Sequence, residues 1–339
     1  MGDRLARALA PYLLPVQAPA GRILLAVSGG PDSTALLHAA ARLGSAVSLA
    51  VATVDHGLRP EAAGEAEAVG QRARELGLSH TTLRWETRPR GGIQAAARAA
   101  RYRLLAAHAS EIGAHRVLTG HTADDQAETV LMRLIAGSGP TGLAGMRRER
   151  TLAEGIRLAR PFLDLPKAEL VAYCETHGLS FVTDPANADI RFARARLRAL
   201  APLLAGEGLT TERLTRLAER LARDETALSR AAAGLLDTSR RPSAAGTLAL
   251  DGPGLLAAPE ALALRVLDLA LEAVQPASAR AVPRRLERLE RLVLDALLPA
   301  LARGEPLRRT LRGVLVEAAS DGTIRVVPAP PRRIFGQGP

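Results

Sequence analysis

The chain has 339 residues, 47% of them hydrophobic, so it can bury a sizeable core and exceeds the roughly 100–200 residues of one domain. It carries 45 Lys and Arg residues against 35 Asp and Glu, a formal charge of +10, and every Lys or Arg except Lys167 is arginine. Guanidinium groups bind phosphates in a bidentate manner, so the excess favours RNA or DNA as a partner, although a solvated Arg and Glu surface explains the charge equally well. The single cysteine, Cys174, excludes an intramolecular disulfide and any paired-cysteine metal or redox site.

Aromatic residues make up only 2% of the chain, so a nucleic acid would be bound chiefly through its backbone. The apolar run at the N-terminus is too short for a signal peptide, and no apolar run reaches about 18 residues. The sequence therefore predicts a cytoplasmic protein without a membrane partner. The sequence does not determine the oligomeric state, and a homodimer is one possibility.

From residue 22 the sequence alternates short apolar runs with segments of helical period. The runs expected to form strands are residues 23–28, 47–56, 80–85 and 115–121. This alternation predicts an α/β fold with an open, doubly wound parallel sheet and helices on both faces. In such sheets a ligand lies beyond the carboxyl ends of the strands, at the switch in strand order. Residues 28–33 and 120–125 each follow a predicted strand, so we expect both segments at that edge.

The composition changes after residue 204, where long segments rich in Arg, Glu, Leu and Ala have helical period. Alternation around Asp321 and Gly322 is typical of a β-hairpin. The predicted domains are a sheet domain over 1–204, a helical domain over 209–305, a β-hairpin over 306–328 and a loose tail over 329–339.

A glycine-rich loop connects the first predicted strand to a helix and consists of Ser28, Gly29, Gly30, Pro31, Asp32 and Ser33. In that context, backbone N–H groups and the positive end of the helix dipole converge on an anion. Gly29 and Gly30 permit close approach of a phosphate, and Asp32 would face Mg²⁺ or the α-phosphate. Neither G-x-x-x-x-G-K-[ST] nor G-x-G-x-x-G is present. A tight turn capped by Ser28 and Asp32 is the alternative, but the spacing favours ATP binding.

A second segment, "TGHTADDQAETVLMRL", predicts a helix that carries two carboxylates on one face, Asp125 and Glu128, with His121 just before its first turn. An ordinary helix start with Thr122 as N-cap is the alternative. The carboxylates suit a cation, either an ammonium or Mg²⁺. A zinc site is conceivable but ranks lower, because no second His or Cys lies nearby.

Residues 95–105 predict an amphipathic helix with arginines on one face. Arg98 or Arg101 would neutralise the charge that develops on a leaving pyrophosphate, with a solvated arginine face as the alternative. The other histidines show no functional signal: His38, His56, His80, His108, His115 and His177.

The glycine-rich loop resembles the signature of the PP-loop ATPases, which cut ATP between the α- and β-phosphates. The ordered segments 28–33, 54–59, 97–102, 120–129, 137–146 and 183–198 are together similar to the tRNA(Ile)-lysidine synthetases. This resemblance implies a ligase in tRNA modification. Such an enzyme adenylates the wobble cytidine of an isoleucine tRNA with a CAU anticodon and replaces its C2 oxygen with the ε-amino group of free L-lysine, releasing AMP and pyrophosphate.

The resemblance also implies roles for individual residues. The loop residues 28–33 would hold ATP, with Asp32 on Mg²⁺. Arg101 and His121 would support adenylyl transfer, with the pKa of His121 near neutrality, and Asp125 and Glu128 would bind lysine. The arginines expected at the RNA backbone are Arg191, Arg194, Arg196 and Arg198, for which ion pairs with Glu residues are nearly as good an explanation. The arginine-rich helical domain is the candidate for gripping the tRNA body.

The sequence departs from the family pattern at Ala136, where the family usually has arginine, and at Ala195, where it usually has asparagine. It is also expected to lack the further C-terminal domain of longer members. A tRNA thiolase or a glutamine amidotransferase would share the loop, but the lone Cys174 disfavours both. A nucleotide-binding module without turnover is the remaining alternative.

Overall fold

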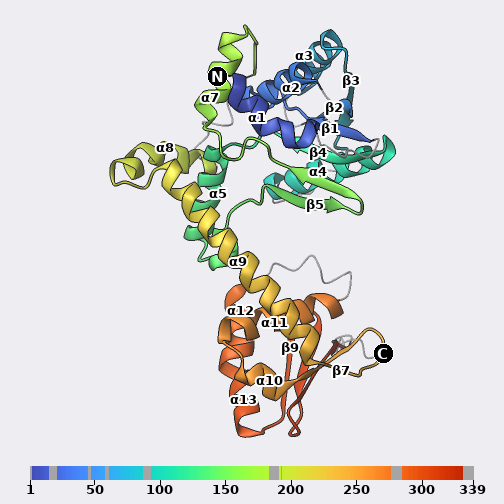
Figure 1. The fold of residues 1–339 in the computed structure, drawn as a ribbon, viewed down its shortest axis with the longest axis vertical. Coiled ribbons are helices and arrows are strands. Elements are labelled where there is room, and N and C mark those ends of the chain that lie inside the picture. The colour runs from blue at the N-terminus through green and yellow to red at the C-terminus, as the bar shows by residue number, and fades with distance from the viewer. Residues whose placement is uncertain are drawn as a thin grey trace, which may run out of the picture. The chain divides into compact units, whose positions relative to one another are not determined.

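The computed structural model describes residues 2–14, 21–44, 47–57, 61–86, 93–182, 191, 193–275 and 285–330. The chain forms two compact units (Figure 1). The first is Met1–Gly137 with Gly142–Arg220, and the second is Ser138–Thr141 with Leu221–Pro339. The domain limits expected from composition, at residues 204 and 209, remain a prediction. Within the described ranges no helix is both long and apolar enough to cross a membrane.

A six-stranded sheet forms the centre of the first unit, in the order β3-β2-β1-β4-β6-β5. Its strands are β1 (Arg22–Ala26), β2 (Ser48–Asp55), β3 (Ser79–Arg84), β4 (Ala114–Thr119), β5 (Glu149–Ala153) and β6 (Ile156–Ala159). Neighbouring strands pair in parallel, except that β5 and β6 form an antiparallel edge pair. The open parallel α/β sheet predicted from the sequence is confirmed.

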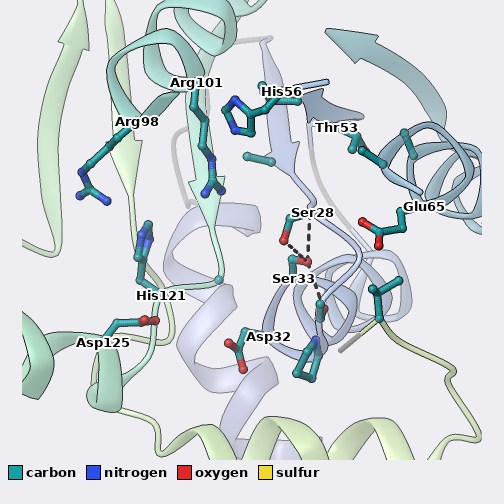
Figure 2. Close-up of a pocket in the computed structure, with 18 of the residues that line it drawn as sticks. Ser28, Asp32, Ser33, Thr53, His56, Glu65, Arg98, Arg101, His121 and Asp125 are labelled. Atoms are coloured by element: carbon teal, nitrogen blue, oxygen red, sulfur yellow. Dashed lines mark hydrogen bonds between the residues drawn. The ribbon is translucent and has the colours of Figure 1, made fainter. Parts of the chain in front are cut away.

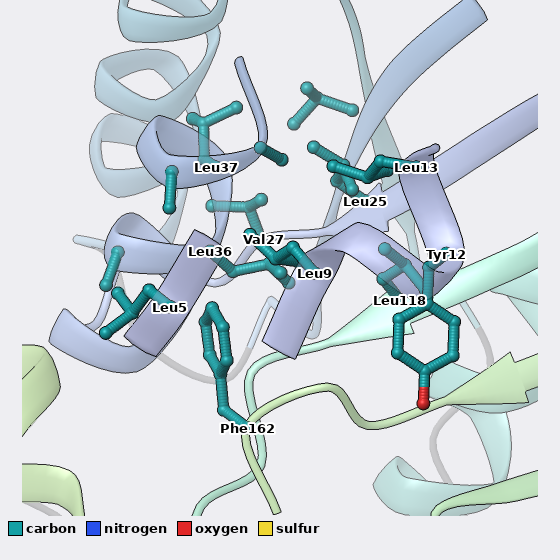
Figure 3. Packing of buried hydrophobic residues seen from close by; sticks show 14 of the residues in the cluster. Leu5, Leu9, Tyr12, Leu13, Leu25, Val27, Leu36, Leu37, Leu118 and Phe162 are labelled. Carbon is teal, nitrogen blue, oxygen red and sulfur yellow. The ribbon is translucent and has the colours of Figure 1, made fainter. Parts of the chain in front are cut away.

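Helices cover both faces of this sheet. They are α1 (Gly2–Leu13), α2 (Pro31–Leu43), α3 (Ala62–Glu75) and α7 (Lys167–Thr176) on one face and α4 (Ile93–Glu111) on the other. The alternation within β1 sets this arrangement: Ile23 and Leu25 lie in the cluster with α1 and α2, whereas Leu24 lies in the cluster with α4. Figure 3 shows Leu25 close to side chains of the first cluster. A strand buried on both faces explains why its sequence is continuously apolar.

The switch in strand order lies between β1 and β4, which are neighbours in the sheet. β1 leads through residues 28–33 into α2, and β4 leads through Gly120 into α5 (Ala123–Ile135). The two loops touch, because a Cβ added to Gly120 would lie 2.7 Å from the carbonyl oxygen of Asp32. The expected meeting of these segments at one edge is confirmed.

Three further helices complete the first unit and begin the second: α6 (Pro140–Leu143), α8 (Ala193–Gly206) and α9 (Thr211–Ser239). Ala127 and Leu131 of α5 share a buried cluster with Leu197 of α8 and Leu214 of α9. This cluster holds α8 beside α5, so basic residues of α8 are brought to the carboxylate helix.

The second unit contains a five-stranded antiparallel sheet in the order β7-β8-β11-β10-β9. Its strands are β7 (Arg240–Arg241), β8 (Leu248–Asp251), β9 (Leu307–Leu311), β10 (Val314–Ala318) and β11 (Thr323–Pro328). The helices that pack with it are α10 (Gly252–Ala257), α11 (Glu260–Val274), α12 (Leu286–Leu292) and α13 (Leu298–Arg303), with a π-helical turn, η3 (Val293–Leu297), between the last two.

The predicted hairpin around Asp321 and Gly322 is present as β10 and β11, with Val316 paired to Val326. It belongs to the larger sheet. The strands β7 and β8 were not expected, because they are only 2 and 4 residues long and too short to show alternation.

Candidate active site

A cavity of about 430 Å³ lies at the carboxyl ends of the central strands of the first unit, and we call it the first cavity (Figure 2). Among the residues that line it are these predicted site residues: Ser28, Gly30, Pro31, Asp32, Ser33, Arg101, His121, Asp125, Arg194 and Arg198. The structure thus brings together side chains from the glycine-rich loop, α4, α5 and α8. Glu128 does not line this cavity.

The glycine-rich loop is held by its own hydrogen bonds. The Ser28 N–H donates to Ser33 Oγ at 3.1 Å, and Ser33 Oγ donates to the carbonyl of Gly30 at 3.1 Å. Gly29 has a φ of +86°, a left-handed conformation that favours glycine. The first turn of α2, whose N–H groups have no acceptor within the helix, lines the cavity through Pro31, Asp32 and Ser33. This turn can bind an anion.

Asp32 is the carboxylate of this loop, and its surroundings fit a cation. Lys167 Nζ lies 3.4 Å from Oδ2, whereas Oδ1 is buried with no hydrogen-bond partner among the described residues. Burial raises the pKa of Asp32 to about 6, although the Lys167 ammonium opposes the rise. Across the described part of the chain, no group of three or more His, Cys, Asp or Glu side chains could hold a metal. Mg²⁺ characteristically uses one or two carboxylates together with substrate phosphates, so Asp32 fits that ion.

His121 lies between β4 and α5, and Figure 2 shows its ring near Arg98 and Asp125. The Thr119 hydroxyl donates to the carbonyl of Ala159 at 3.3 Å, and its oxygen lies 2.8 Å from His121 Nδ1. Since the Thr119 proton is engaged, we assign the Nδ1–H tautomer, which leaves Nε2 as an acceptor.

The expectation that His121 titrates near neutrality is wrong. Burial, and then the positive charge of Arg101, lower the pKa of His121 well below its ordinary value. Three further arginines act in the same direction: Arg160, Arg98 and Arg194. The imidazole is therefore neutral at pH values near 7 in this environment. A neutral ring can accept a hydrogen bond or a proton but cannot neutralise phosphate charge.

An ordinary helix start with Thr122 as N-cap, the alternative interpretation, is present, and Asp125 completes it as a capping box. Its Oδ2 accepts from the Thr122 N–H at 3.0 Å, and the Thr122 hydroxyl caps the helix in return. Asp125 nevertheless lines the first cavity as well as a second one of about 340 Å³. Capping and site roles are compatible, because the cap fixes the direction of the carboxylate.

The second cavity lies between α5, α8 and the start of α9. It is lined by polar Asp124, Asp125, Glu128, Lys167 and Arg198, and by apolar residues that include Leu131, Leu197 and Leu214. Glu128 is buried and paired with Arg198, whose Nε and Nη2 both donate to its carboxylate, the second at 3.2 Å. Burial raises the pKa of Glu128 and outweighs the opposing effect of Arg198.

The arginines of the basic helix α8 differ in position. Arg194 and Arg198 line the first cavity, whereas Arg196 lines neither cavity and donates from its guanidinium to the carbonyl of Arg191, which precedes the helix, at 2.9 Å. Arg191 lines neither cavity. Of the family departures, Ala195 is buried within α8, and Ala136 is exposed where α5 ends. The rest of the segment 183–198, apart from these positions, lies largely outside the described residues.

Comparison with known proteins identifies the architecture. A family model described as "PP-loop domain" matches residues 3–204. The chain is 58% identical over 316 residues to the tRNA(Ile)-lysidine synthase of Methylobacterium nodulans, covering 93% of this chain and 92% of that protein. It is 48% identical to the tRNA(Ile)-lysidine synthase of Rhodopseudomonas palustris, covering 92% and 91%.

The chain belongs to the tRNA(Ile)-lysidine synthase family. Among solved structures it is similar to the U34-tRNA thiolase NcsA of Methanococcus maripaludis, with a TM-score of 0.56 and 18% identity over 65% of this chain and 79% of that one. At that identity the likeness shows the fold alone. The first cavity of this family member therefore lies in a PP-loop domain that uses ATP.

Several lining residues were missed from the sequence. His56, which showed no separate signal, follows β2 and lines the first cavity with Thr53 and Glu65. The position of His56 just after a strand was a usable signal, because the carboxyl ends of neighbouring parallel strands meet. Lys167 was also missed, although it is the one lysine of the chain and begins α7.

Proposed function

We propose that this protein forms lysidine: it joins the ε-amino group of L-lysine to C2 of the wobble cytidine in isoleucine tRNA with a CAU anticodon, at the expense of ATP. The observation that carries the proposal is the meeting of the glycine-rich loop after β1 with the carboxylate helix after β4 around one cavity. The relatives named tRNA(Ile)-lysidine synthase match nearly the whole chain and support the same reaction.

In the first step, ATP binds with its phosphates at the first turn of α2, where Ser28, Gly30 and Ser33 line the cavity. The C2 oxygen of cytidine attacks the α-phosphorus, the bond to the bridging oxygen breaks, and pyrophosphate leaves. Mg²⁺, held by Asp32 and the phosphates, would neutralise charge on the leaving group. Arg101 lines the same cavity and would offset negative charge that develops there.

His121 would act as a neutral group in this step. Its Nε2 is free to accept a hydrogen bond from the substrate, because Nδ1 is committed to Thr119. Its low pKa follows from burial and nearby arginines. Anionic phosphates would raise that pKa when they enter the cavity, since opposite charges stabilise the protonated ring.

In the second step, lysine would occupy the second cavity. The Glu128 and Arg198 pair offers an anion and a cation side by side, which suits the α-ammonium and α-carboxylate of a free amino acid. Leu131 and Leu197 would pack against the aliphatic stem. Asp125, which lines both cavities, would direct the ε-amine towards the cytidine. After the ammonium loses a proton, the amine attacks C2, the C2–O bond breaks, and AMP leaves.

The RNA would be held by arginine. Arg194 lines the first cavity and not the second, so we assign it to the substrate end of the tRNA. The exposed Arg196, with Arg191 before it, and the arginine-rich second unit would contact the RNA backbone elsewhere. We place the reaction in the cytoplasm.

The test uses purified protein, Mg²⁺-ATP, radiolabelled lysine and an unmodified transcript of isoleucine tRNA bearing CAU. Label retained on the RNA only when ATP is present, and lost in Asp32→Ala, is the expected result. AMP production without retained label would keep the adenylating activity and refute the lysine acceptor. An isoleucine transcript with the anticodon changed from CAU to GAU is the matched RNA control.

A further inference from the structure

A group of arginines gathers around Tyr102, and one of them, Arg98, lines the first cavity with His121. We call Arg98, Tyr102, Arg150 and Arg160 the arginine–tyrosine cluster. Figure 2 shows Arg98 reaching towards His121 rather than towards the glycine-rich loop. Arg98 and Arg160 both lower the pKa of His121 through their charge, which places them near that ring.

The Tyr102 ring organises the cluster. The guanidinium carbon of Arg98 lies 5.3 Å from the ring centroid, and that of Arg150 lies 4.9 Å from it. Cation–π contact holds each guanidinium in place, so less side-chain entropy is lost when a ligand binds. Arg98 comes from α4 and Arg150 from the edge strand β5, so the cluster joins two elements that are far apart in sequence.

The third arginine is buried. Arg160 is only 3% exposed, and its Nη1 donates to the carbonyl of Arg147 at 2.6 Å. Its Nε is buried with no hydrogen-bond partner in the described part of the chain. Burial alone would raise the pKa of Tyr102, but the positive charges of Arg98, Arg101 and Arg160 outweigh it and the pKa is lowered. The hydroxyl of Tyr102 therefore lies in a strongly positive electrostatic potential.

Arg98, Arg150 and Arg160 have no ion pair among the described residues. In contrast, Arg157 on β6, the strand paired with β5, has a carboxylate partner. Glu149 lies 3.4 Å from Arg157 and 3.9 Å from Arg116. Arg150, the residue after Glu149, instead donates to the carbonyl of Thr151 at 3.1 Å. Concentrated positive charge of this kind is unfavourable in the protein alone and becomes favourable when an anion binds.

The phosphates of ATP have their own site at the first turn of α2 and Asp32, so the cluster suits a second anion. The substrate nucleotide must enter the first cavity, and a phosphodiester flanks it on either side. Arginine is the side chain best matched to a phosphate, since its planar donors bind two oxygens together.

We propose that Arg98 and Arg150, organised by the ring of Tyr102 and supported by the buried charge of Arg160, bind a backbone phosphate of the RNA next to the nucleotide that enters the first cavity. The inference rests on the proposed function for the identity of the RNA. It assigns Arg150, which lies outside the motifs of the sequence, to substrate binding and the buried Arg160 to a supporting charge.

The test compares Arg150→Gln with Arg157→Gln, a matched change on the next strand at an arginine that already has a carboxylate partner. Binding of the unmodified CAU isoleucine transcript is measured over a salt series, and binding of Mg²⁺-ATP is measured separately. We expect Arg150→Gln to weaken RNA binding about tenfold and to reduce the salt dependence by about 0.7 in slope, the value for one single-strand phosphate contact. The ATP affinity and melting temperature of Arg150→Gln should equal those of the parent. Arg157→Gln should equal the parent in RNA affinity, salt dependence, ATP affinity and melting temperature.

Two outcomes for Arg150→Gln would overturn the proposal. Weaker ATP binding with unchanged RNA binding would assign the cluster to the nucleotide. Parental affinities for both ATP and RNA would show that Arg150 binds no anion. Both outcomes are distinct from a failure of the proposed function. Loss of RNA affinity in Arg150→Gln, together with a parent that retains no lysine on the RNA, would uphold the phosphate site and refute lysidine formation.

Discussion

Lys167 Nζ lies 3.4 Å from Asp32 Oδ2, so the one lysine of the chain contacts the one carboxylate of the glycine-rich loop. Lys167 also lines both cavities. An ammonium at this position competes with a metal ion for Asp32. The contact therefore lies where the first cavity, which we propose binds ATP, meets the second cavity, which we propose binds lysine.

Asp32→Asn should lower ATP-dependent pyrophosphate release by about two orders of magnitude, because the amide no longer attracts a cation. Lys167→Met should leave the reaction in place and lower the Mg²⁺ concentration for half-maximal rate. Both are measured at about pH 8, where Asp32, with a pKa of about 6, is ionised. A higher Mg²⁺ requirement in Lys167→Met would show that the ammonium acts on the nucleotide rather than as a competitor.

Glu128→Gln should separate the two half-reactions. The change removes the charge that faces Arg198 while preserving side-chain shape, so the KM for lysine should rise at least about tenfold. Pyrophosphate release with ATP and tRNA alone should stay near the parental rate. Equal loss of both half-reactions would mean that the pair maintains the fold of α5 and α8 rather than a lysine site, and a melting curve distinguishes the two.

Gly120→Ala should damage both stability and activity. Its Cβ would lie 2.7 Å from the carbonyl oxygen of Asp32, so the two loops must move apart, at a cost of about 1–3 kcal/mol in the free energy of unfolding. Gly64→Ala on α3 is the control, since a Cβ there meets nothing within 4 Å. Denaturant unfolding of both variants checks the expectation, which fails if they have equal midpoints.

Glu225→Gln should destabilise the second unit in a pH-dependent way. The Glu225 carboxylate accepts hydrogen bonds from Arg265 at 2.6 Å and from Thr141 at 2.9 Å. Burial opposes ionisation, but these contacts outweigh it and lower the pKa of Glu225. Because the pKa of Glu225 is lower in the folded state, its ionised carboxylate stabilises the fold fully at pH values above the unfolded pKa of 4.5. This contribution is lost as the pH falls from 4.5 through the folded pKa.

The loss of stability in Glu225→Gln should therefore be about 2 kcal/mol near neutral pH and should shrink as the pH falls below about 4.5. Thermal melting over a pH series measures it. The exposed Glu219 on α9 provides the control, because Glu219→Gln should change little at any pH. A constant difference across the series would exclude the charge of Glu225 as the cause.

Local chemistry made part of this site predictable. The position of the loop at residues 28–33 beside the first cavity follows from adjacent glycines before a helix, and the Thr122 cap follows from a residue type with a known preference. The parallel pairing of the strands follows from the alternation of apolar runs and helices. These features depend on a few neighbouring residues, which a sequence displays directly.

Long-range contacts were not predictable in the same way. Glu128 and Arg198 are separated by 70 positions, and no periodicity relates them. The low pKa of His121 depends on burial and on arginines from several elements, so the residue type alone gave the wrong expectation. The contact between Arg150 and Tyr102 likewise exists only because the edge strand β5 pairs with β6 and thereby lies near α4.

Having a single lysine gives the molecule a selective chemical handle. An amine-directed label has one lysine side chain to modify, and that side chain, 41% exposed, stands where the two cavities meet. The yield of that modification, read by mass spectrometry, would therefore report how well each substrate shields the reaction centre, without any substitution in the protein.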